Sequence, residues 1–276
     1  MSFSDDERER YVRHIMLKEI GGPGQQRLKN ATVAIVGAGG LGAPAALYLA
    51  AAGIGKLRII DHDTVSLSNL QRQILYRGAD VGALKVERAQ ETLQALNPNV
   101  QVEAIAARLT GPPAPSPASA GDAGEGAGGP VDAAELLEDA TLVLDGTDDF
   151  ATRFAVNAAC HQLSIPLISG AVGRWQGQVA TFKSGPTKHL PPDQRLPCYR
   201  CFVPEIPPDA DTCAQVGVVG ALTGVIGSLI ALEAIKEITG AGESLAGRVL
   251  LYDGLTAQSR TVALHHDPAC PVCAHD

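Results

Sequence analysis

The chain has 276 residues, a formal net charge of −8 at pH 7 and 19% charged residues. This composition is ordinary for a globular protein and excludes a chain-wide basic surface for nucleic acid. The charged amino terminus lacks the apolar segment of a signal peptide, so we expect a cytoplasmic protein. Residues 214–232 carry no charge over 19 positions, but four glycines among them favour a tightly packed buried helix over a membrane span.

Strand and helix patterns alternate along the first part of the chain. A helical pattern covers residues 5–19 and a Gly-Gly-Pro-Gly turn follows at 21–24, so amino-terminal helices are expected within 5–29. The next expected elements are strands at 31–36, 56–60, 100–106, 141–144 and 166–169 and helices at 43–52, 82–96 and 151–163. Strand, glycine turn, helix and strand form a βαβ unit, which predicts an α/β, Rossmann-like doubly wound sheet with mostly parallel strands.

An unusual segment interrupts this pattern at residues 110–130. It contains 6 Gly, 5 Pro and 5 Ala and has no bulky apolar side chain. Such a segment buries too little surface to offset its ordering entropy, which predicts a disordered insertion. Because the globular pattern resumes beyond it, we expect a single domain over residues 1–276, with a nucleotide-binding part at 31–170 and a second part at 171–276.

The second part is expected to add antiparallel strands to the sheet. Two alternating segments, 248–252 and 259–264, predict a closing hairpin. Before them we expect an extended segment, two proline-rich loops and a long helix, in that order at 178–183, 184–197, 204–212 and 216–239.

The glycine turn after the first strand predicts a nucleotide site. Gly37, Gly39 and Gly42 match G-x-G-x-x-G between a strand and a helix, where a phosphate can approach bare backbone N–H groups. Asp61 ends the next strand, where a ribose hydroxyl would be bound. On their own these residues suit NAD, FAD or ATP.

The residues that follow favour a nucleoside triphosphate. Asn69, Arg72 and Lys85 have no evident use together in a dehydrogenase, whereas Arg and Lys can neutralise phosphate charge during transfer. An Asp-Gly-Thr-Asp-Asp segment at 145–149 ends a later strand, and an aspartate at that place can hold Mg²⁺.

Two C-x-x-C pairs predict a structural zinc site. Four thiolates suit tetrahedral Zn²⁺ and leave no open coordination position. The four cysteines are Cys198, Cys201, Cys270 and Cys273. Cys160 lies on an apolar helix face and is expected in the core.

These motifs together resemble the MoeB/ThiF/HesA family, whose members are similar to the adenylation domain of ubiquitin-activating enzymes. The resemblance covers about residues 8–273, apart from the insertion. It is carried by VGAGGLG, DxDTVSLSNLQRQ, Lys85, TDD at 147–149, CYRC, TC at 212–213 and the final CPVC.

The resemblance implies an enzyme that uses ATP to adenylate the carboxyl-terminal glycine of a ubiquitin-like sulfur carrier and releases pyrophosphate. The carrier would bind the 171–276 part, and a separate protein would donate the sulfur. Molybdopterin biosynthesis is the first expectation, and thiamine or another sulfur pathway is the alternative. A NAD-dependent oxidoreductase and a non-catalytic carrier-binding scaffold are more distant alternatives.

The resemblance also implies which residues form the site. Arg72 and Lys85 would carry catalysis, and Asp148 would hold Mg²⁺. Arg13 would reach the phosphates of a neighbouring subunit, which implies a homodimer with shared sites. The implied nucleotide-binding residues are Gly37, Gly39, Gly40, Gly42, Asp61, Ser68, Asn69, Leu70, Gln71, Arg72, Lys85, Asp148 and Asp149.

Several roles stay open. Some family members use the cysteine that matches Cys213 in a thioester or acyl disulfide, and others bear it without needing it. The family often has asparagine where this sequence has Asp149. Asp145 suits either a metal site or a turn cap, and Arg153 suits either the phosphate loop or structural hydrogen bonding.

Overall fold

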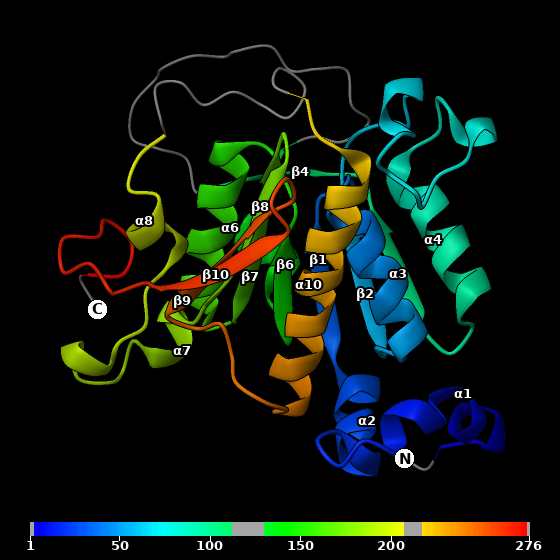
Figure 1. Cartoon of the computed structure of the whole chain (residues 1–276), viewed down its shortest axis with the longest axis horizontal. Coiled ribbons are helices and arrows are strands. Elements are labelled where there is room, and N and C mark those ends of the chain that lie inside the picture. The colour runs from blue at the N-terminus through cyan, green and yellow to red at the C-terminus, as the bar shows by residue number, and fades with distance from the viewer. Residues whose placement is uncertain (1–2, 112–129, 207–216, 275–276) are drawn as a thin grey trace.

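The computed structural model describes residues 3–111, 130–206 and 217–274. Its centre is an eight-stranded sheet with the strand order β10-β9-β8-β7-β6-β1-β2-β3 (Figure 1). The strands are β1 (Thr32–Val36), β2 (Lys56–Ile60), β3 (Gln101–Ile105), β6 (Leu142–Asp145), β7 (Leu167–Gly173), β8 (Gln176–Phe182), β9 (Arg248–Asp253) and β10 (Gln258–Ala263).

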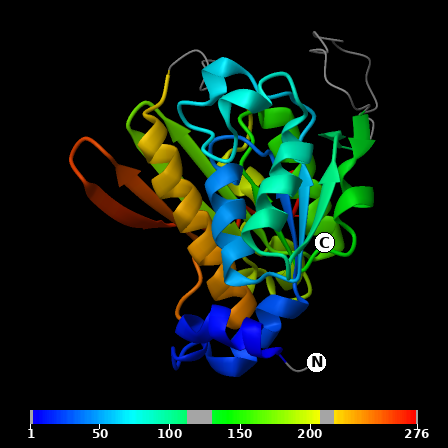
Figure 2. The same ribbon diagram turned by 90° about the vertical axis from the view of Figure 1, so that its right-hand side faces the viewer.

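The sheet has a parallel half and an antiparallel half. The five strands β3, β2, β1, β6 and β7 run parallel, and β8, β9 and β10 continue the sheet antiparallel. Figure 2 shows the β9–β10 hairpin extending beyond α10 (Gly220–Thr239), away from the parallel strands. The expected α/β fold, mostly parallel and then antiparallel, is confirmed.

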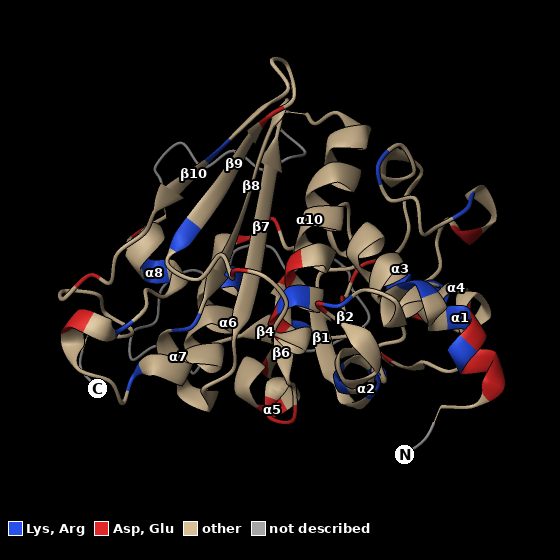
Figure 3. Ribbon diagram, turned by 60° about the horizontal axis from the view of Figure 1, so that its bottom comes forward, with Lys and Arg blue, Asp and Glu red and all other residues tan. Residues whose placement is uncertain are grey.

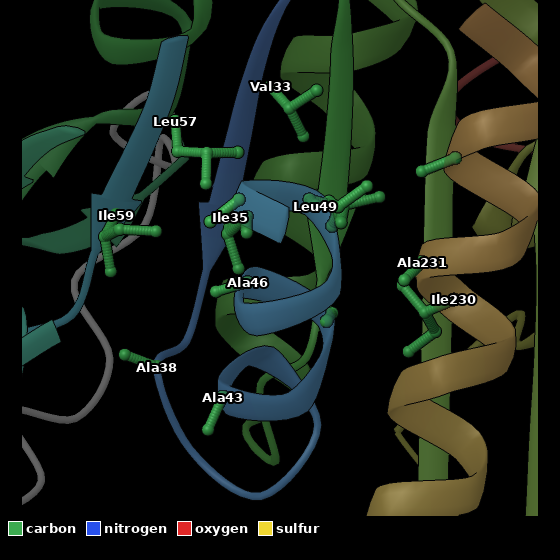
Figure 4. Close-up of a cluster of buried hydrophobic side chains, with 14 of the residues drawn as sticks. Val33, Ile35, Ala38, Ala43, Ala46, Leu49, Leu57, Ile59, Ile230 and Ala231 are labelled. Carbon is green, nitrogen blue, oxygen red and sulfur yellow. The ribbon is translucent and has the colours of Figure 1, made fainter. Parts of the chain in front are cut away.

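Helices cover both faces of the sheet because successive strand residues point to opposite faces. Val33 and Ile35 of β1 pack in the cluster that includes α3 (Gly42–Ala52), α4 (Lys85–Leu96) and α10 (Figure 4). Ala34 and Val36 pack in the second cluster, against α5 (Ala133–Leu137), α6 (Phe150–Leu163) and α8 (Tyr199–Phe202).

The amino-terminal helices differ from the expectation. The first, α1 (Asp5–Ile15), is capped by Ser4 and Glu7 and ends before residue 19. The expected turn at 21–24 is wrong, because α2 (Gly21–Asn30) begins there. Pro23 is compatible with this position because the first turn of a helix needs no backbone N–H partner.

Short elements were missed where the sequence predicted loops or no regular element. The strands β4 (Arg108–Thr110) and β5 (Pro130–Asp132) pair in parallel, so both ends of the expected insertion belong to a small second sheet. Residues 112–129 and 207–216 lie outside the described part, and the predicted disorder remains a prediction. Short helices also occur at α7 (Ser184–Thr187), η1 (Leu67–Asn69), η2 (Gly78–Asp80) and η3 (Pro192–Gln194).

The glycine-rich helix α10 packs against α3. A Cβ atom at Gly227 would lie 2.4 Å from Cγ of Pro44 and 2.7 Å from the carbonyl oxygen of Leu41. At Gly224, in contrast, a Cβ atom would meet nothing within 4 Å. None of the described helices is long and apolar enough to span a membrane.

Gly227→Ala should therefore lower the free energy of unfolding by about 1–3 kcal/mol, because an added methyl forces the two helices apart. Gly224→Ala on the same helix should leave stability unchanged or raise it by up to about 1 kcal/mol. Urea denaturation of both variants checks this. Equal effects at the two positions would contradict the close contact.

Candidate functional site

A cavity of about 480 Å³ lies at the carboxyl ends of β1, β2 and β6. Its size is in the usual range for a small-molecule site. The chain leaves β1 toward β2 and β3 on one side and returns to β6 on the other side. This reversal of strand order is where doubly wound sheets bind their ligands.

The glycine turn between β1 and α3 forms one wall of the cavity. Gly37 has a φ of +89°, and a Cβ atom at Gly42 would lie 1.9 Å from the carbonyl oxygen of Gly37. The chain can turn this tightly only without side chains. Gly37, Gly39 and Gly40 line the cavity just before the amino terminus of α3. The helix dipole and the free N–H groups at that end stabilise a bound anion.

Asp61 lies beside this turn, directly after β2. Its Oδ2 accepts a 2.8 Å hydrogen bond from the backbone N–H of Ala38, and its Oδ1 accepts one of 2.8 Å from Asp63. Burial raises the pKa of Asp61 above its usual value, although the positive charge of Lys85 acts in the opposite direction.

Lys85 and Arg72 are two of the cationic residues that line the cavity. Lys85 begins α4 and is 4% exposed, with Nζ 2.7 Å from Oδ2 of Asp63 and 4.0 Å from Oδ2 of Asp61. Arg72 donates from Nη1 to the carbonyl oxygen of Ser68 at 3.1 Å. Both side chains line the cavity and can meet phosphate charge.

The three aspartates at the end of β6 and in the loop that follows occupy three different environments. Asp145 is buried and accepts hydrogen bonds from the backbone and hydroxyl of Thr147 and from Ser169. It therefore caps the turn, which is one of the two roles left open. Asp148 is exposed and lines the cavity.

Asp149 is the N-cap of α6. Its carboxylate accepts hydrogen bonds from the backbone of Ala151 and from the backbone and hydroxyl of Thr152. Burial acts to raise the pKa of Asp149, but these hydrogen bonds and the charge of Arg108 outweigh it and hold the pKa below its usual value. An asparagine can cap a helix equally well.

Arg153 makes structural hydrogen bonds to the loop that carries these aspartates. Its guanidinium donates to the carbonyl oxygens of Thr147 and Gly170, and it lies 3.8 Å from the Asp145 carboxylate. It also lines the cavity, so it supports the loop from the cavity wall.

The structure brings together most of the residues expected from sequence. Those that line the cavity are Gly37, Gly39, Gly40, Asp61, Asn69, Arg72, Lys85, Asp148 and Asp149. Gly42, Ser68, Leu70 and Gln71 do not line it, although Gly42 shapes the turn and Ser68 holds Arg72. Cys213 lies outside the described residues.

Arg13 does not line this cavity. It lies in the last turn of α1 and is exposed. Because α2 leads directly into β1, α1 and α2 lie at the end of the sheet opposite the cavity (Figure 1), and α1 presents its charged residues at the edge of the molecule (Figure 3).

Sequence reasoning missed several polar residues of the cavity wall, among them Gln73, Arg108 and Thr223. Gln73 follows Asn69 by four positions, and its backbone N–H donates to the carbonyl oxygen of Asn69 at 3.0 Å. That helical spacing was a usable signal. The Thr223 hydroxyl donates to the carbonyl oxygens of Gly220 and Arg72. No sequence motif predicts the contact with Arg72.

The four cysteines converge at the start of α8 and near the end of the chain. The Sγ atoms of Cys198 and Cys270 are 3.5 Å apart, and those of Cys201 and Cys273 are 3.4 Å apart. All four sulfurs lie within 4.8 Å of one another. Tetrahedral zinc with sulfurs at about 2.3 Å needs separations of about 3.8 Å, so this cluster can hold it. Cys160 is buried in the core, as expected.

The doubly wound sheet, the glycine turn and the cationic cavity define a nucleotide-binding α/β protein. The ThiF family model matches residues 11–272, and the chain belongs to the ThiF family. It is an enzyme of the adenylyltransferase class.

Similar proteins agree with this assignment. The sulfur carrier protein adenylyltransferase of Thermus thermophilus is 44% identical over 278 residues, covering 100% of this chain and 94% of that protein. The molybdopterin-synthase adenylyltransferase of Escherichia coli K12 is 42% identical over 270 residues, covering 98% of each chain. The crystal structure of selenomethionine PaaA matches with a TM-score of 0.72 and 28% identity, covering 95% of this chain and 75% of that chain.

Replacing one cysteine of the cluster should abolish metal binding. Metal analysis of the purified protein should give about one Zn²⁺ per chain, and Cys270→Ser should reduce it to below about 0.1 and lower the melting temperature. Cys160→Ala, at a buried cysteine outside the cluster, should keep the zinc. Zinc content unchanged in Cys270→Ser would contradict a four-cysteine site.

Asp149→Ala should lower the free energy of unfolding by about 1 kcal/mol at pH 7, because α6 loses its N-cap. The folded-state pKa of Asp149 is lowered, so this stabilisation is complete above the unfolded-state pKa of about 3.9 and is lost as pH falls through the folded value. Urea denaturation between pH 3 and 7 checks it. A difference that persists undiminished at low pH, or an equal loss in the exposed-site control Asp193→Ala, would contradict the cap.

Proposed function

We propose that this protein adenylates the carboxyl-terminal glycine of a ubiquitin-like sulfur carrier. The observation that carries the proposal is the cavity wall itself. One cavity is lined by a glycine turn at the amino terminus of a helix and by Asp61, which could accept hydrogen bonds from a ribose. The cations Arg72 and Lys85 and the exposed Asp148 line the same cavity. Two relatives that this chain matches over nearly their whole length are named a sulfur carrier protein adenylyltransferase and a molybdopterin-synthase adenylyltransferase.

The chemistry follows from charge. A carboxylate oxygen attacks the α-phosphorus of ATP, the bond to the bridging oxygen breaks, and pyrophosphate leaves with the bond electrons. The attacking carboxylate is already ionised at pH 7, so no general base is needed. Repulsion between the carboxylate and the polyphosphate is the main barrier, and Arg72 and Lys85 offset it.

Asp148 is the residue best suited to Mg²⁺. It is an exposed carboxylate on the cavity wall, and Mg²⁺ binds through one or two carboxylates while it keeps several waters. When bound there, Mg²⁺ would neutralise phosphate charge. Asp145 and Asp149 are engaged in hydrogen bonds to their own loop and helix.

A second cavity supports a protein substrate. It measures about 580 Å³ and lies on β7 and on the antiparallel strands β8, β9 and β10. Its wall shares Ala171, Val172 and Gln178 with the wall of the first cavity. An extended carboxyl-terminal tail bound over β7 and β8 would therefore reach the nucleotide cavity. Molybdopterin biosynthesis is our first choice of pathway, thiamine or another sulfur pathway is the alternative, and a separate protein would supply the sulfur.

We also propose a homodimer in which Arg13 of each subunit serves the site of the other. Arg13 lies at the far end of its own sheet from the cavity, so it cannot serve its own site. Exposed apolar side chains follow it, with Met16 70% exposed and Leu17 48% exposed. Buried between two subunits, they would stabilise an interface.

The proposed reaction is tested by ATP–pyrophosphate exchange with each candidate carrier, with and without Mg²⁺. Exchange should appear with one carrier and vanish when its terminal glycine is removed. Arg72→Ala should lower kcat/KM by about 10²–10³-fold, because the leaving group loses its counter-charge. Arg8→Ala, which removes an exposed ion pair on α1, should have the same kcat/KM as the unchanged protein. An unchanged rate of pyrophosphate exchange in Arg72→Ala would contradict the catalytic role of Arg72.

Mixed dimers test the shared site. Arg13→Ala and Lys85→Ala should each be nearly inactive alone. In an equal mixture about half the dimers are hybrids with one unaltered site, so about a quarter of the activity should return. No recovery after verified subunit exchange would show that Arg13 does not act across the interface.

A further inference from the structure

Tyr199 belongs both to the segment that carries the cysteine cluster and to the wall of the first cavity. It directly follows Cys198, and Cys201 comes two residues later, so two of the clustered cysteines flank it in the chain. Its side chain lines the first cavity. The backbone N–H of Cys201 donates to the carbonyl oxygen of Cys198 at 3.1 Å. A metal held by both cysteines would fix this turn, and with it the backbone of Tyr199.

The surroundings of Tyr199 hold its ring in one place. Its backbone N–H donates to Oδ1 of Asn157 on α6 at 2.7 Å. Its ring packs edge-on against Phe182, with 5.6 Å between the ring centroids. Phenylalanine could make the same ring contacts, so the hydroxyl of Tyr199 is the part of the side chain that packing does not account for.

The hydroxyl of Tyr199 meets Arg153. Nη1 of Arg153 donates to it at 3.5 Å, and the guanidinium carbon lies 5.9 Å from the centroid of the Tyr199 ring. Arg153 also donates to the carbonyl oxygen of Thr147, the residue directly before Asp148. Contacts therefore run without a gap from the cysteine cluster through Tyr199 and Arg153 to the loop that presents Asp148.

Tyr199 and Arg153 act on this loop rather than on a ligand. They are 3% and 6% exposed, so they offer little surface to a nucleotide, whereas Asp148 is exposed. A buried guanidinium keeps its orientation only while its hydrogen-bond partners stay in place, because an unpaired charge in the interior is costly. A shift of Tyr199 would therefore be passed through Arg153 to the carbonyl group of Thr147.

We propose that Tyr199 is a positioning residue that couples zinc binding at the four cysteines to the binding of Mg–ATP in the first cavity. Zinc fixes α8, Tyr199 then supports Arg153, and Arg153 holds the loop with Asp148 in the position that receives Mg²⁺. Coupling between two binding sites is reciprocal, so each ligand raises the affinity for the other by the same factor. The proposal rests on the proposed function in taking Mg–ATP as the ligand.

Competition with a coloured zinc chelator tests the coupling without any carrier. The zinc affinity of the full-length protein is measured with and without saturating Mg–ATP, and the chelator is calibrated in the same two solutions. Mg–ATP should raise the zinc affinity by about 5- to 50-fold. Tyr199→Phe keeps the ring and removes the hydroxyl. This variant should still bind about one Zn²⁺ per chain, but Mg–ATP should change its zinc affinity by less than about twofold.

Calorimetric titration with ATP gives the reciprocal measurement. In zinc-loaded Tyr199→Phe the affinity for Mg–ATP should fall by about 5- to 50-fold, whereas the affinity for ATP without Mg²⁺ should be unchanged, because the loop acts through Asp148. A role in packing alone would lower the melting temperature without singling out the magnesium complex. Tyr11→Phe is the matched control. It removes another buried hydroxyl, which accepts a 2.9 Å hydrogen bond from Asn97, and should leave both measurements as they are in the unchanged protein.

An equal effect of Mg–ATP on zinc affinity in Tyr199→Phe and in the unchanged protein would overturn the proposal, since the coupling would then not pass through the hydroxyl. It would also be overturned if Mg–ATP bound to the unchanged protein without changing its zinc affinity. Failure of the unchanged protein to bind Mg–ATP would overturn both this proposal and the proposed function. Absence of pyrophosphate exchange with every carrier, in a protein that shows the coupling, would refute the proposed function alone.

Discussion

The rest of the site depends on the approach of three backbone segments that carry no side chains where they meet. A Cβ atom at Gly42 would overlap the carbonyl oxygen of Gly37, at 1.9 Å, and one at Gly146 would lie 3.1 Å from the backbone nitrogen of Gly42. The end of β1, the start of α3 and the loop after β6 can therefore converge. This convergence brings strand ends that are far apart in sequence to one cavity, and it directs the positive end of the α3 dipole toward that cavity.

The three carboxylates between residues 145 and 149 have different roles, and the roles follow from how deeply each is buried. Asp145 is 1% exposed and holds the loop through Thr147, while Asp149 fixes the start of α6. Asp148, between Thr147 and Asp149, is the exposed one. A loop that is tied at both ends can present a single free carboxylate to a ligand with little loss of conformational entropy on binding.

Sequence pattern predicted the long elements well because each was encoded locally. The buried strands β1, β2 and β6 and the helices around them follow from apolar periodicity. The pairing of β4 with β5 could not be read, because two three-residue strands gain their stability from each other across the insertion. At 21–24, glycine and proline predicted a turn, yet the tertiary packing of Leu28 and its neighbours extends a helix there.

The candidate site was predictable where its residues belong to a recognisable motif. Asp61 directly follows β2, and Asn69, Arg72 and Lys85 come soon after it in the chain, whereas Arg108 belongs to no such motif. Gln73 and Thr223 are neutral, and only the three-dimensional contacts show that they line the cavity. Arg13, in contrast, was expected from the resemblance, and within one chain it is exposed on α1 and does not line the cavity.

The cysteine cluster also determines how the edge of the sheet can open. Cys201 and Cys273 are 72 residues apart, and α10, β9 and β10 lie between them. A metal bound by these cysteines closes that stretch into a ring. All six residues of the edge strand β10 are exposed, which is the arrangement most prone to fraying and to pairing with other chains. With a metal bound there, the segment that follows β10 would be tied to the start of α8, which would limit fraying of this edge of the sheet.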